Sequence, residues 1–273
     1  MSFTAADVKT LREMTSVGMM DCKKALIEAE GDYAKAQDII REKGKLVAAK
    51  RADRSATEGV VVSKIVGGKG YMLCLACETD FVAKNSEFSA TANEILEIAV
   101  KADAADLEAL KAVSVEAGRT VADKVTEKSG QTGEKVELVY YAKIEAPMCV
   151  TYIHTNHKLG VLVGFNKEIA METAKDVAMQ AAAMAPVSID KGDCDPKIIE
   201  HERMIGREQA RQEGKPEAML DKIAEGKVNK FLKENTLLNQ DLVKNNKISV
   251  GTYIKEADKD ATVIAYKRFS LND

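Results

Sequence analysis

The feature that most restricts the fold of this 273-residue chain is a pattern that occurs twice. Gly59–Lys101 contains two short apolar runs on either side of a glycine-rich turn, followed by a stretch with apolar residues at helical spacing. Pro147–Met184 repeats this order at a similar length, with a polar tip between its apolar runs. Apolar runs joined by a turn predict a β-hairpin, and apolar residues three and four apart predict a helix. The chain is therefore expected to form two related α+β units in which helices pack on antiparallel sheets.

Further segments complete each unit. A helical region at about 106–128 and a strand at 135–146 follow the first hairpin and its helix. For the second unit, the segments 247–257 and 261–271 contain many β-branched and aromatic residues. Since such residues favour strands, we expect these two segments to add another hairpin to the second unit.

The N-terminal residues 4–43 predict three short helices. Thr4 with Asp7 three residues later is a helix-start box, Gly18 separates the first two helices, and Asp32 is a good N-cap for the third. We expect the third helix to stop at Gly44, before a basic, Ala-rich linker that is helical in part. Three helices of this size form a module of marginal independent stability.

A long charged insert separates the second hairpin and its helix from the end of the chain. Two helical stretches joined by Gly214-Lys-Pro216 predict an antiparallel helical hairpin or coiled coil. Its narrow apolar stripe has two interpretations, packing of the hairpin on itself or a face that serves a partner. The stripe consists of Leu220, Ala224, Val228 and Phe231. The expected division of the chain is 1–54, 55–145, 146–185 together with 236–273, and the inserted hairpin 186–235.

Composition excludes several classes of function. With 40 Lys+Arg against 43 Asp+Glu, the chain lacks the basic excess of a dedicated nucleic-acid binder, and its 5% aromatic content offers few stacking platforms. No apolar run approaches the roughly 20 residues of a membrane span. The N-terminus carries acids and no unbroken apolar core, unlike a signal peptide. Five scattered cysteines fit a reducing cytoplasm better than a disulfide framework. We expect a cytoplasmic protein with no nucleic-acid or membrane partner.

The pair Cys74-Leu-Ala-Cys77 is the clearest suggestion of an enzyme. A redox pair needs both sulfur atoms on one side, usually at the start of a helix. Here the pair lies in a predicted strand, where positions three apart point to opposite faces. The two thiols are therefore expected to diverge, which argues against redox chemistry or metal binding.

Other catalytic constellations are missing from the sequence. His154 and His157 flank a predicted hairpin tip, but two imidazoles do not complete a zinc site. No phosphate-binding loop, dinucleotide fingerprint or nucleophile elbow is present. We expect no metal, no cofactor, no direct nucleotide binding and no covalent chemistry. His154 is either an exposed contact residue or a solvated turn histidine.

Two short segments favour an interaction function instead. Asp80 and Phe81 follow the second strand of the first unit, where Phe81 is either a core residue or an aromatic wedge with a charge beside it. Such a wedge on a rigid support is typical of an interface hot spot. Met19 and Met20 lie in a turn between two predicted helices, where both cannot easily be buried. Methionine is common at adaptable binding surfaces, although ordinary packing of one of the two is the alternative.

Several motifs together resemble the translation elongation factor Ts family. They fall in the order of the family and cover nearly the whole chain: Val17–Leu26 (VGMMDCKKAL), Thr79–Lys84 (TDFVAK), Tyr152–His154, Leu159–Val163, and Gly214–Pro216 with Glu225-Gly226. The resemblance implies a guanine-nucleotide exchange factor for the GTPase elongation factor Tu. It implies a ubiquitin-associated-like N-terminal module, two α+β core subdomains, and an inserted coiled coil through which a homodimer could form.

The resemblance also implies roles for particular residues. Phe81 would enter between helices of the GTPase domain near its Mg²⁺ and phosphate site, with Asp80 holding the intrusion in register. The family's Gly-Glu element falls at Gly133-Glu134. The residues expected to contact the partner are Asp80, Phe81 and Val82 in the first unit, Met19, Met20 and Lys23 in the N-terminal module, His154, Leu159 and Gly160 in the second unit, and Gly133.

The sequence departs from the family at two places. Many members continue past the last strand into a C-terminal helix that touches the GTPase, and we expect that contact to be missing here. His157 occupies a tip position that is often glycine in relatives. Two other functions are alternatives: an adaptor or chaperone-like scaffold that binds peptides through the N-terminal module, and an oxidoreductase that uses Cys74 and Cys77.

Overall fold

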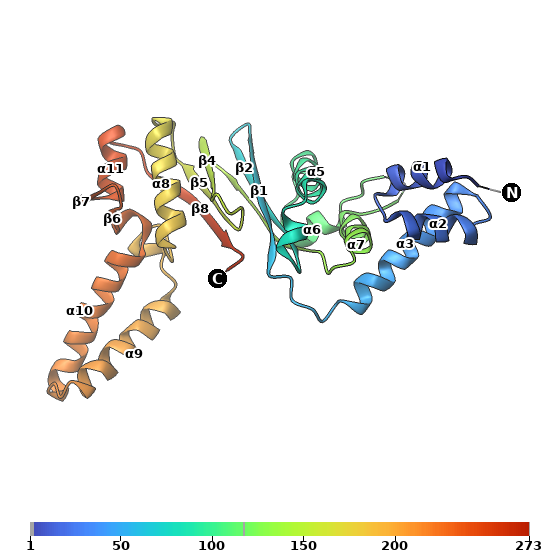
Figure 1. Ribbon diagram of the computed structural model, residues 1–273. Helices are drawn as coiled ribbons and strands as arrows, with labels where there is room; N and C mark the ends of the chain where they lie inside the picture. The colour runs from blue at the N-terminus through green and yellow to red at the C-terminus, as the bar shows by residue number, and fades with distance from the viewer. Residues whose placement is uncertain (1–2, 117, 273) are drawn as a thin grey trace.

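The computed structural model describes residues 3–116 and 118–272. The described chain is elongated, with a group of helices at the N-terminal end, two sheets in the middle and a pair of helices projecting at the far end (Figure 1). The two main sheets are three-stranded and antiparallel, helices pack beside them, and a third, smaller sheet has two strands. The predicted α+β class is therefore confirmed.

The first unit is an antiparallel sheet with helices over one face. Its strands follow the order β1-β2-β3, and Leu73 and Leu75 of the central strand share a buried cluster with Phe88 and Ile95 of the main helix. The elements are β1 (Glu58–Val66), β2 (Lys69–Cys77), α4 (Asp80–Ala83), α5 (Ser86–Ala102), α6 (Leu107–Ala112), α7 (Val121–Thr132) and β3 (Glu137–Glu145).

The prediction of continuous helix over 106–128 was wrong. Two helices, α6 and α7, occupy this region: α6 ends at Ala112 and α7 begins only at Val121. Ser114 and Thr120 form an isolated antiparallel bridge, and Thr120 then caps α7 by accepting a hydrogen bond from the Asp123 N–H. The capping box starts a new helix at this position, which the apolar periodicity alone did not reveal.

The second unit repeats the topology of the first. Its main sheet has the order β4-β5-β8, so the third strand again pairs with the second strand of a hairpin, and a helix follows that hairpin. The elements are β4 (Met148–Ile153), β5 (Leu159–Phe165), α8 (Met171–Met184), β6 (Asp241–Leu242), β7 (Asn245–Ser249), α11 (Val250–Ala257) and β8 (Val263–Ser270). The internal repeat predicted from the sequence is confirmed.

The predicted hairpin from 247–257 and 261–271 was wrong. Val250 and Ile254, four residues apart, are both buried on one face of α11, and the Ser249 side chain caps this helix. The strand β8 does form, but it pairs with β5 instead of with its predicted neighbour. Burial at helical spacing and a cap outweighed the strand propensity of these residues.

The two sheets pack face to face. A buried cluster that includes Val61, Met72 and Cys74 of the first sheet and Cys149 and Leu162 of the second lies between them. The helices α5–α7 cover the outer face of one sheet, whereas α8 and α11 cover the outer face of the other (Figure 1). The body is thus a four-layer sandwich of helices, sheet, sheet and helices.

Three helices precede this sandwich: α1 (Ala5–Thr15), α2 (Met19–Glu28) and α3 (Tyr33–Lys50). The capping box at Thr4 and the cap at Asp32 are present as predicted. However, α3 does not stop at Gly44. Gly44 lies inside the helix and against Gly130 of α7, so closely that a Cβ added to Gly130 would lie 2.5 Å from the Gly44 Cα. The glycine serves a helix crossing here instead of a helix end.

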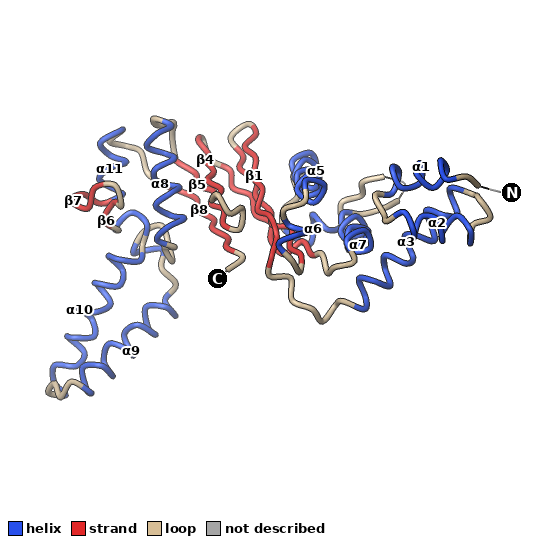
Figure 2. Tube along the Cα trace, in the orientation of Figure 1, coloured by secondary structure: helices blue, strands red, loops and turns tan. Residues whose placement is uncertain are grey.

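A pair of helices, α9 (Pro196–Gln212) and α10 (Glu217–Asn235), extends away from the sheets (Figure 2). Leu220, Ala224 and Val228 are buried, and the Cβ of an alanine at Gly206 would lie 3.3 Å from the Ala224 Cα. Most of the stripe seen in the sequence is therefore covered by the two helices themselves. Short 3-10 helices precede and follow the pair, at Lys191–Asp193 and Leu237–Asn239.

Candidate partner-binding site

The turn after β2 presents an aromatic side chain to solvent. Phe81 is 84% exposed, the largest exposed fraction among the exposed large apolar side chains of the described residues. It lies in the one-turn helix α4, whose next residues face inward: Val82 packs against the core of the first unit and Ala83 is buried. The interpretation of Phe81 as a core residue was therefore wrong. The turn is anchored on one side and displays Phe81 on the other.

Glu134 fixes the start of this turn. One oxygen of its carboxylate accepts hydrogen bonds from the backbone N–H groups of Glu78 (3.1 Å) and Thr79 (3.0 Å). The other oxygen accepts from the Thr79 hydroxyl at 2.6 Å. The Thr79 Oγ1 in turn accepts a hydrogen bond from the Val82 N–H, at 3.4 Å, as the N-cap of α4. Glu134 thus holds the residues before Phe81 directly, and it holds Val82, after Phe81, only through Thr79.

The Glu78 carboxylate bonds in return to the segment that contains Glu134. It accepts a hydrogen bond from the Lys135 N–H at 2.6 Å and from the Arg51 guanidinium at 2.8 Å, and Arg54 lies 3.5 Å away. The backbone N–H of Lys135, followed by the Arg51 side chain, holds the pKa of Glu78 below its usual range. Only 12% of the Glu78 side chain is exposed, so its charge depends on these partners.

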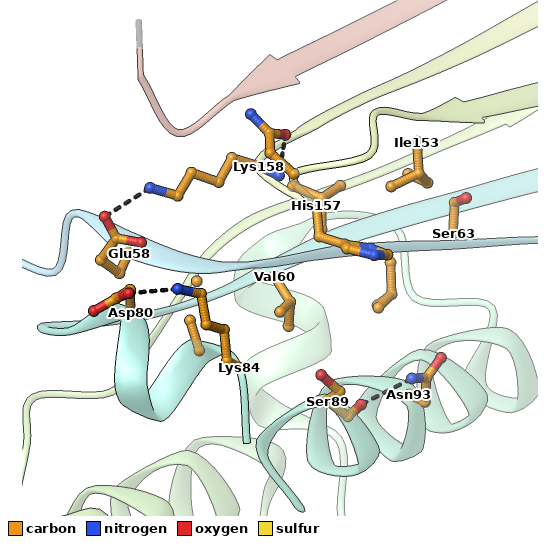
Figure 3. A pocket seen from close by; sticks show the side chains of 15 residues that line it. Glu58, Val60, Ser63, Asp80, Lys84, Ser89, Asn93, Ile153, His157 and Lys158 are labelled. Atoms are coloured by element: carbon orange, nitrogen blue, oxygen red, sulfur yellow. Dashed lines mark hydrogen bonds and ion pairs between the residues drawn. The ribbon is translucent and has the colours of Figure 1, made fainter. Parts of the chain in front are cut away.

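A groove runs beside the turn, between β1, α5 and the tip of the second hairpin (Figure 3). Asp80 lines one end of it, with its carboxylate 2.6 Å from the Lys84 ammonium, which is the largest influence lowering the pKa of Asp80. On the opposite wall, Lys158 forms an ion pair with Glu58 at 2.6 Å. The charges along this groove are therefore paired within the chain.

Sequence similarity shows the family of the chain. A family model described as "Elongation factor TS" matches residues 78–273. Proteins named elongation factor Ts from Azobacteroides pseudotrichonymphae and Porphyromonas gingivalis are each 46% identical, over 100% of this chain and 99% of their own length. One from Christiangramia forsetii is 47% identical over 98% of each chain. The chain belongs to the elongation factor Ts family.

The N-terminal residues expected to contact a partner in this family are at the surface. Met19 is 41% exposed and Met20 is 63% exposed, at the start of α2 where Gly18 is the N-cap, and Lys23 is also exposed. Neither methionine is buried, so the alternative of ordinary packing for one of them was wrong. Ile27, on the same helix, is 57% exposed and was not singled out from the sequence.

The remaining expected contact residues differ in exposure. His154 is half-buried, with Nδ1 2.9 Å from the Tyr152 hydroxyl, so it is not a freely solvated turn residue. Leu159 is half-buried, whereas Gly160 is buried between the sheets, beside Met72 and Val61. Gly133 ends α7 with a φ of +70°. The structure brings Gly133 to the base of the Phe81 turn through its neighbour Glu134, whereas His154, Leu159 and Gly160 belong to the second unit.

Sequence reasoning missed the residues that hold the turn. Glu134 was noted only as half of a Gly-Glu element, and Glu78, Arg51 and Lys135 had no assigned role. Their contacts join segments 27 to 57 positions apart in the chain. The one local signal was Glu134 itself, a carboxylate directly after a helix-ending glycine, which must find donors or solvent.

The cysteine pair gives no sign of redox chemistry. Cys74 lies in the cluster between the sheets, and Cys77 lies in the cluster under the helices of the first unit. Their predicted divergence to opposite faces is confirmed. Burial raises the pKa of each thiol to about 12. In residues 3–116 and 118–272, no three His, Cys, Asp or Glu side chains are grouped so that they could hold a metal ion. No helix in that part of the chain has the length and apolar character to cross a membrane.

Proposed function

We propose that this chain is a guanine-nucleotide exchange factor that promotes GDP release from elongation factor Tu during translation. Membership of the elongation factor Ts family supports the activity. The observation that carries the mechanism is Phe81, 84% exposed on a turn whose backbone is held by Glu134. A large aromatic on a rigid support offers contact area at a small entropic cost, which is typical of an interface hot spot.

The proposed mechanism is thermodynamic linkage without covalent chemistry. Phe81 enters between helices of the GTPase domain near its Mg²⁺ and phosphate site, with Asp80 at the flank of the intrusion. Since the bound ion and the phosphate cradle hold GDP electrostatically, disturbing them weakens GDP binding. A factor that binds the nucleotide-free GTPase more tightly than the GDP form must lower GDP affinity by the same coupling free energy. This chain itself binds no nucleotide in the proposal.

The other surfaces have supporting roles in the same proposal. Met19, Met20 and Lys23 contact the GTPase domain from the N-terminal unit, which we infer to be a ubiquitin-associated-like module. His154 and Leu159, with Gly160 behind them, and Gly133 belong to further contacts. We infer that the division into 1–54, 55–145, 146–185 with 236–273, and 186–235 describes the functional parts. The α9–α10 hairpin is the part through which a homodimer would form.

The cytoplasm is the proposed location, because translation takes place there. The five cysteines are all free and buried, as expected for a reducing compartment. The ion pairs in the groove beside the Phe81 turn and a net charge of −3 agree with a protein partner rather than nucleic acid.

The decisive experiment measures release of a fluorescent GDP analogue from purified elongation factor Tu at fixed Mg²⁺. Acceleration of release by substoichiometric amounts of this protein is the expected result. If a folded preparation leaves the release rate unchanged, the exchange function is excluded. Peptide binding that depends on Met19 and Met20 would then identify the adaptor or chaperone-like scaffold as the function.

A further inference from the structure

Two carboxylates clasp the turn that carries Phe81 from opposite sides. Glu134 accepts from the backbone of Glu78 and Thr79, and Glu78 accepts from the backbone of Lys135. We propose that Glu134 is a positioning residue, which holds the Phe81 turn in its binding conformation before the partner arrives. This inference rests on the proposed exchange function, and extends it to a residue that does not need to touch the GTPase.

The chemistry of the contact requires a carboxylate. Three donors converge on Glu134: two backbone N–H groups and one hydroxyl. An ionised carboxylate offers only acceptors, and hydrogen bonds to it are stronger than those between neutral groups. A glutamine of the same shape would bring an NH₂ group toward one of these donors. Glu134→Gln therefore removes part of the clasp while keeping the size of the side chain.

The clasp acts on Phe81 through Thr79. The Thr79 hydroxyl has one hydrogen to donate, which goes to Glu134, and its lone pairs accept from the Val82 N–H. The chain from Glu134 to Thr79 to Val82 thus spans the residue that is displayed. Phe81 itself is 84% exposed, so its own packing contributes little to its placement. Its orientation must come from the backbone on either side.

Geometry around Glu134 fits this role. Gly133 ends α7 in the left-handed region, with a φ of +70°, and nothing lies within 4 Å of the place its Cβ would occupy. This turn of the backbone places Glu134 beside the end of β2, three residues before β3 begins at Glu137. Arg51 and Arg54 close the opposite side of the clasp by neutralising Glu78.

A preformed turn should bind faster or more tightly than a mobile one. If the turn were free, binding would have to order its backbone, and that entropic cost would be subtracted from the affinity. Loss of the clasp is therefore expected to weaken binding through Phe81, while Phe81 itself remains present. Its effect should disappear once Phe81 is removed, which a purely structural role does not predict.

The test is a double-mutant cycle on the full chain with Glu134→Gln and Phe81→Ala. In the wild-type background, Glu134→Gln should reduce the affinity for nucleotide-free elongation factor Tu by about tenfold or more. In the Phe81→Ala background, the same change should have little further effect. Equal fold losses in the two backgrounds, or no loss in either, would overturn the proposal. Glu137→Gln is the matched control, because the Glu137 side chain is half-exposed and its ion pair, 3.2 Å from the Lys135 ammonium, is not part of the clasp.

Hydrogen exchange supplies a readout that does not depend on the GTPase. In the free protein, Glu134→Gln should speed amide exchange at residues 79–82 and leave the strands β1 and β2 protected. Unchanged amide hydrogen exchange at residues 79–82 would overturn the positioning role, even if the variant stimulated GDP release less than the wild-type protein does. If the wild-type protein fails to accelerate GDP release, the proposed function is wrong. If Glu134→Gln nevertheless speeds amide exchange at residues 79–82, the positioning role of Glu134 remains supported.

A second pair of variants covers the case in which Glu134→Gln does not fold. Thr79→Val removes the hydroxyl donor and the cap but keeps the shape of the side chain, whereas Thr79→Ser keeps the hydroxyl. The positioning role predicts weaker binding for Thr79→Val and near-normal binding for Thr79→Ser. Equal binding by the two variants would contradict it.

Discussion

The two α+β units share a topology, but the apolar residue four positions after the second strand is exposed in one unit and packed in the other. Four residues past the end of β2 is Phe81, which is 84% exposed. Four residues past the end of β5 is Ile169, which packs against the buried cluster of its own unit. Since the strand order is the same in both, the fold does not by itself force an apolar side chain outward at this place.

Both units tie this exit to the loop before their third strand, but with different chemistry. In the second unit, Asn166 exchanges hydrogen bonds with Thr262 and donates to the Asp260 carbonyl. In the first unit, the charged clasp of Glu78 and Glu134 occupies the corresponding position. A neutral amide closes a structural loop, whereas charge-assisted bonds hold a turn against the tendency of an exposed aromatic to fold back.

The largest effect is expected from Phe81→Ala in the first unit. Phe81→Ala should slow the factor-stimulated release of GDP by at least about 30-fold, because removal of a hot-spot side chain costs about 2 kcal/mol or more. The thermal midpoint should change little, because the side chain is almost fully exposed. Release kinetics and a thermal melt on the same preparation measure both quantities.

Ile169→Ala is the matched change in the second unit. It should lower the free energy of unfolding by about 1–3 kcal/mol through lost packing, and leave GDP release at saturating factor near the wild-type rate. If the two variants behaved alike in both assays, the contrast between a displayed and a packed residue would be wrong.

The next largest effect concerns the crossing of two helices at the first unit. On the first unit, α3 crosses α7 at Gly44 and Gly130. A Cβ on Gly130 would lie 2.5 Å from the Gly44 Cα, but a Cβ on Gly44 would lie 3.5 Å from the Gly130 Cα, which is ordinary contact. Gly130→Ala should therefore destabilise the protein by about 1–3 kcal/mol, since backbone cannot move aside cheaply.

Gly44→Ala is the control for this crossing. It should be neutral, or stabilising by up to about 1 kcal/mol, because alanine is the better helix former. Urea unfolding of the two variants measures the difference. Equal destabilisation by both would contradict the asymmetry, because it would mean that Gly44 is packed as tightly as Gly130.

The contrast between the units also shows how far the sequence predicted this protein. The repeat, its two hairpins β1–β2 and β4–β5, and the divergence of Cys74 and Cys77 followed from spacing, because periodicity is a local property. Gly44 and α11 were misread for one reason: each depends on what packs against it, namely Gly130 in one case and the core of the second unit in the other. Tertiary contact outweighed local preference there.

The same difference between local pattern and tertiary contact applies to the candidate site. Residue type singled out Phe81 with its two possible environments, but it could not choose between them. The clasp that decides the matter joins residues 55 to 57 positions apart, and no pattern in one sequence records such a pairing.

The smallest expected effect compares the two hairpin tips. In the first unit, Gly67 and Gly68 make the turn with φ values of +56° and +80°, which glycine adopts without cost. In the second unit, His157 adopts a φ of +56° although it carries a Cβ. Its carbonyl accepts a hydrogen bond from the Val61 N–H at 2.7 Å, so this strained residue is held by the neighbouring unit.

His157→Gly should therefore stabilise the protein by up to about 1 kcal/mol, because it relieves the left-handed conformation and keeps the carbonyl that bonds to Val61. Asn156→Gly, at the neighbouring position without a positive φ, should instead destabilise slightly by adding freedom to the unfolded chain and removing the side chain that accepts from the Lys158 N–H. Urea midpoints for the pair give the sign of each effect. Destabilisation by His157→Gly would mean that the imidazole, and not only its backbone, joins the second unit to the first.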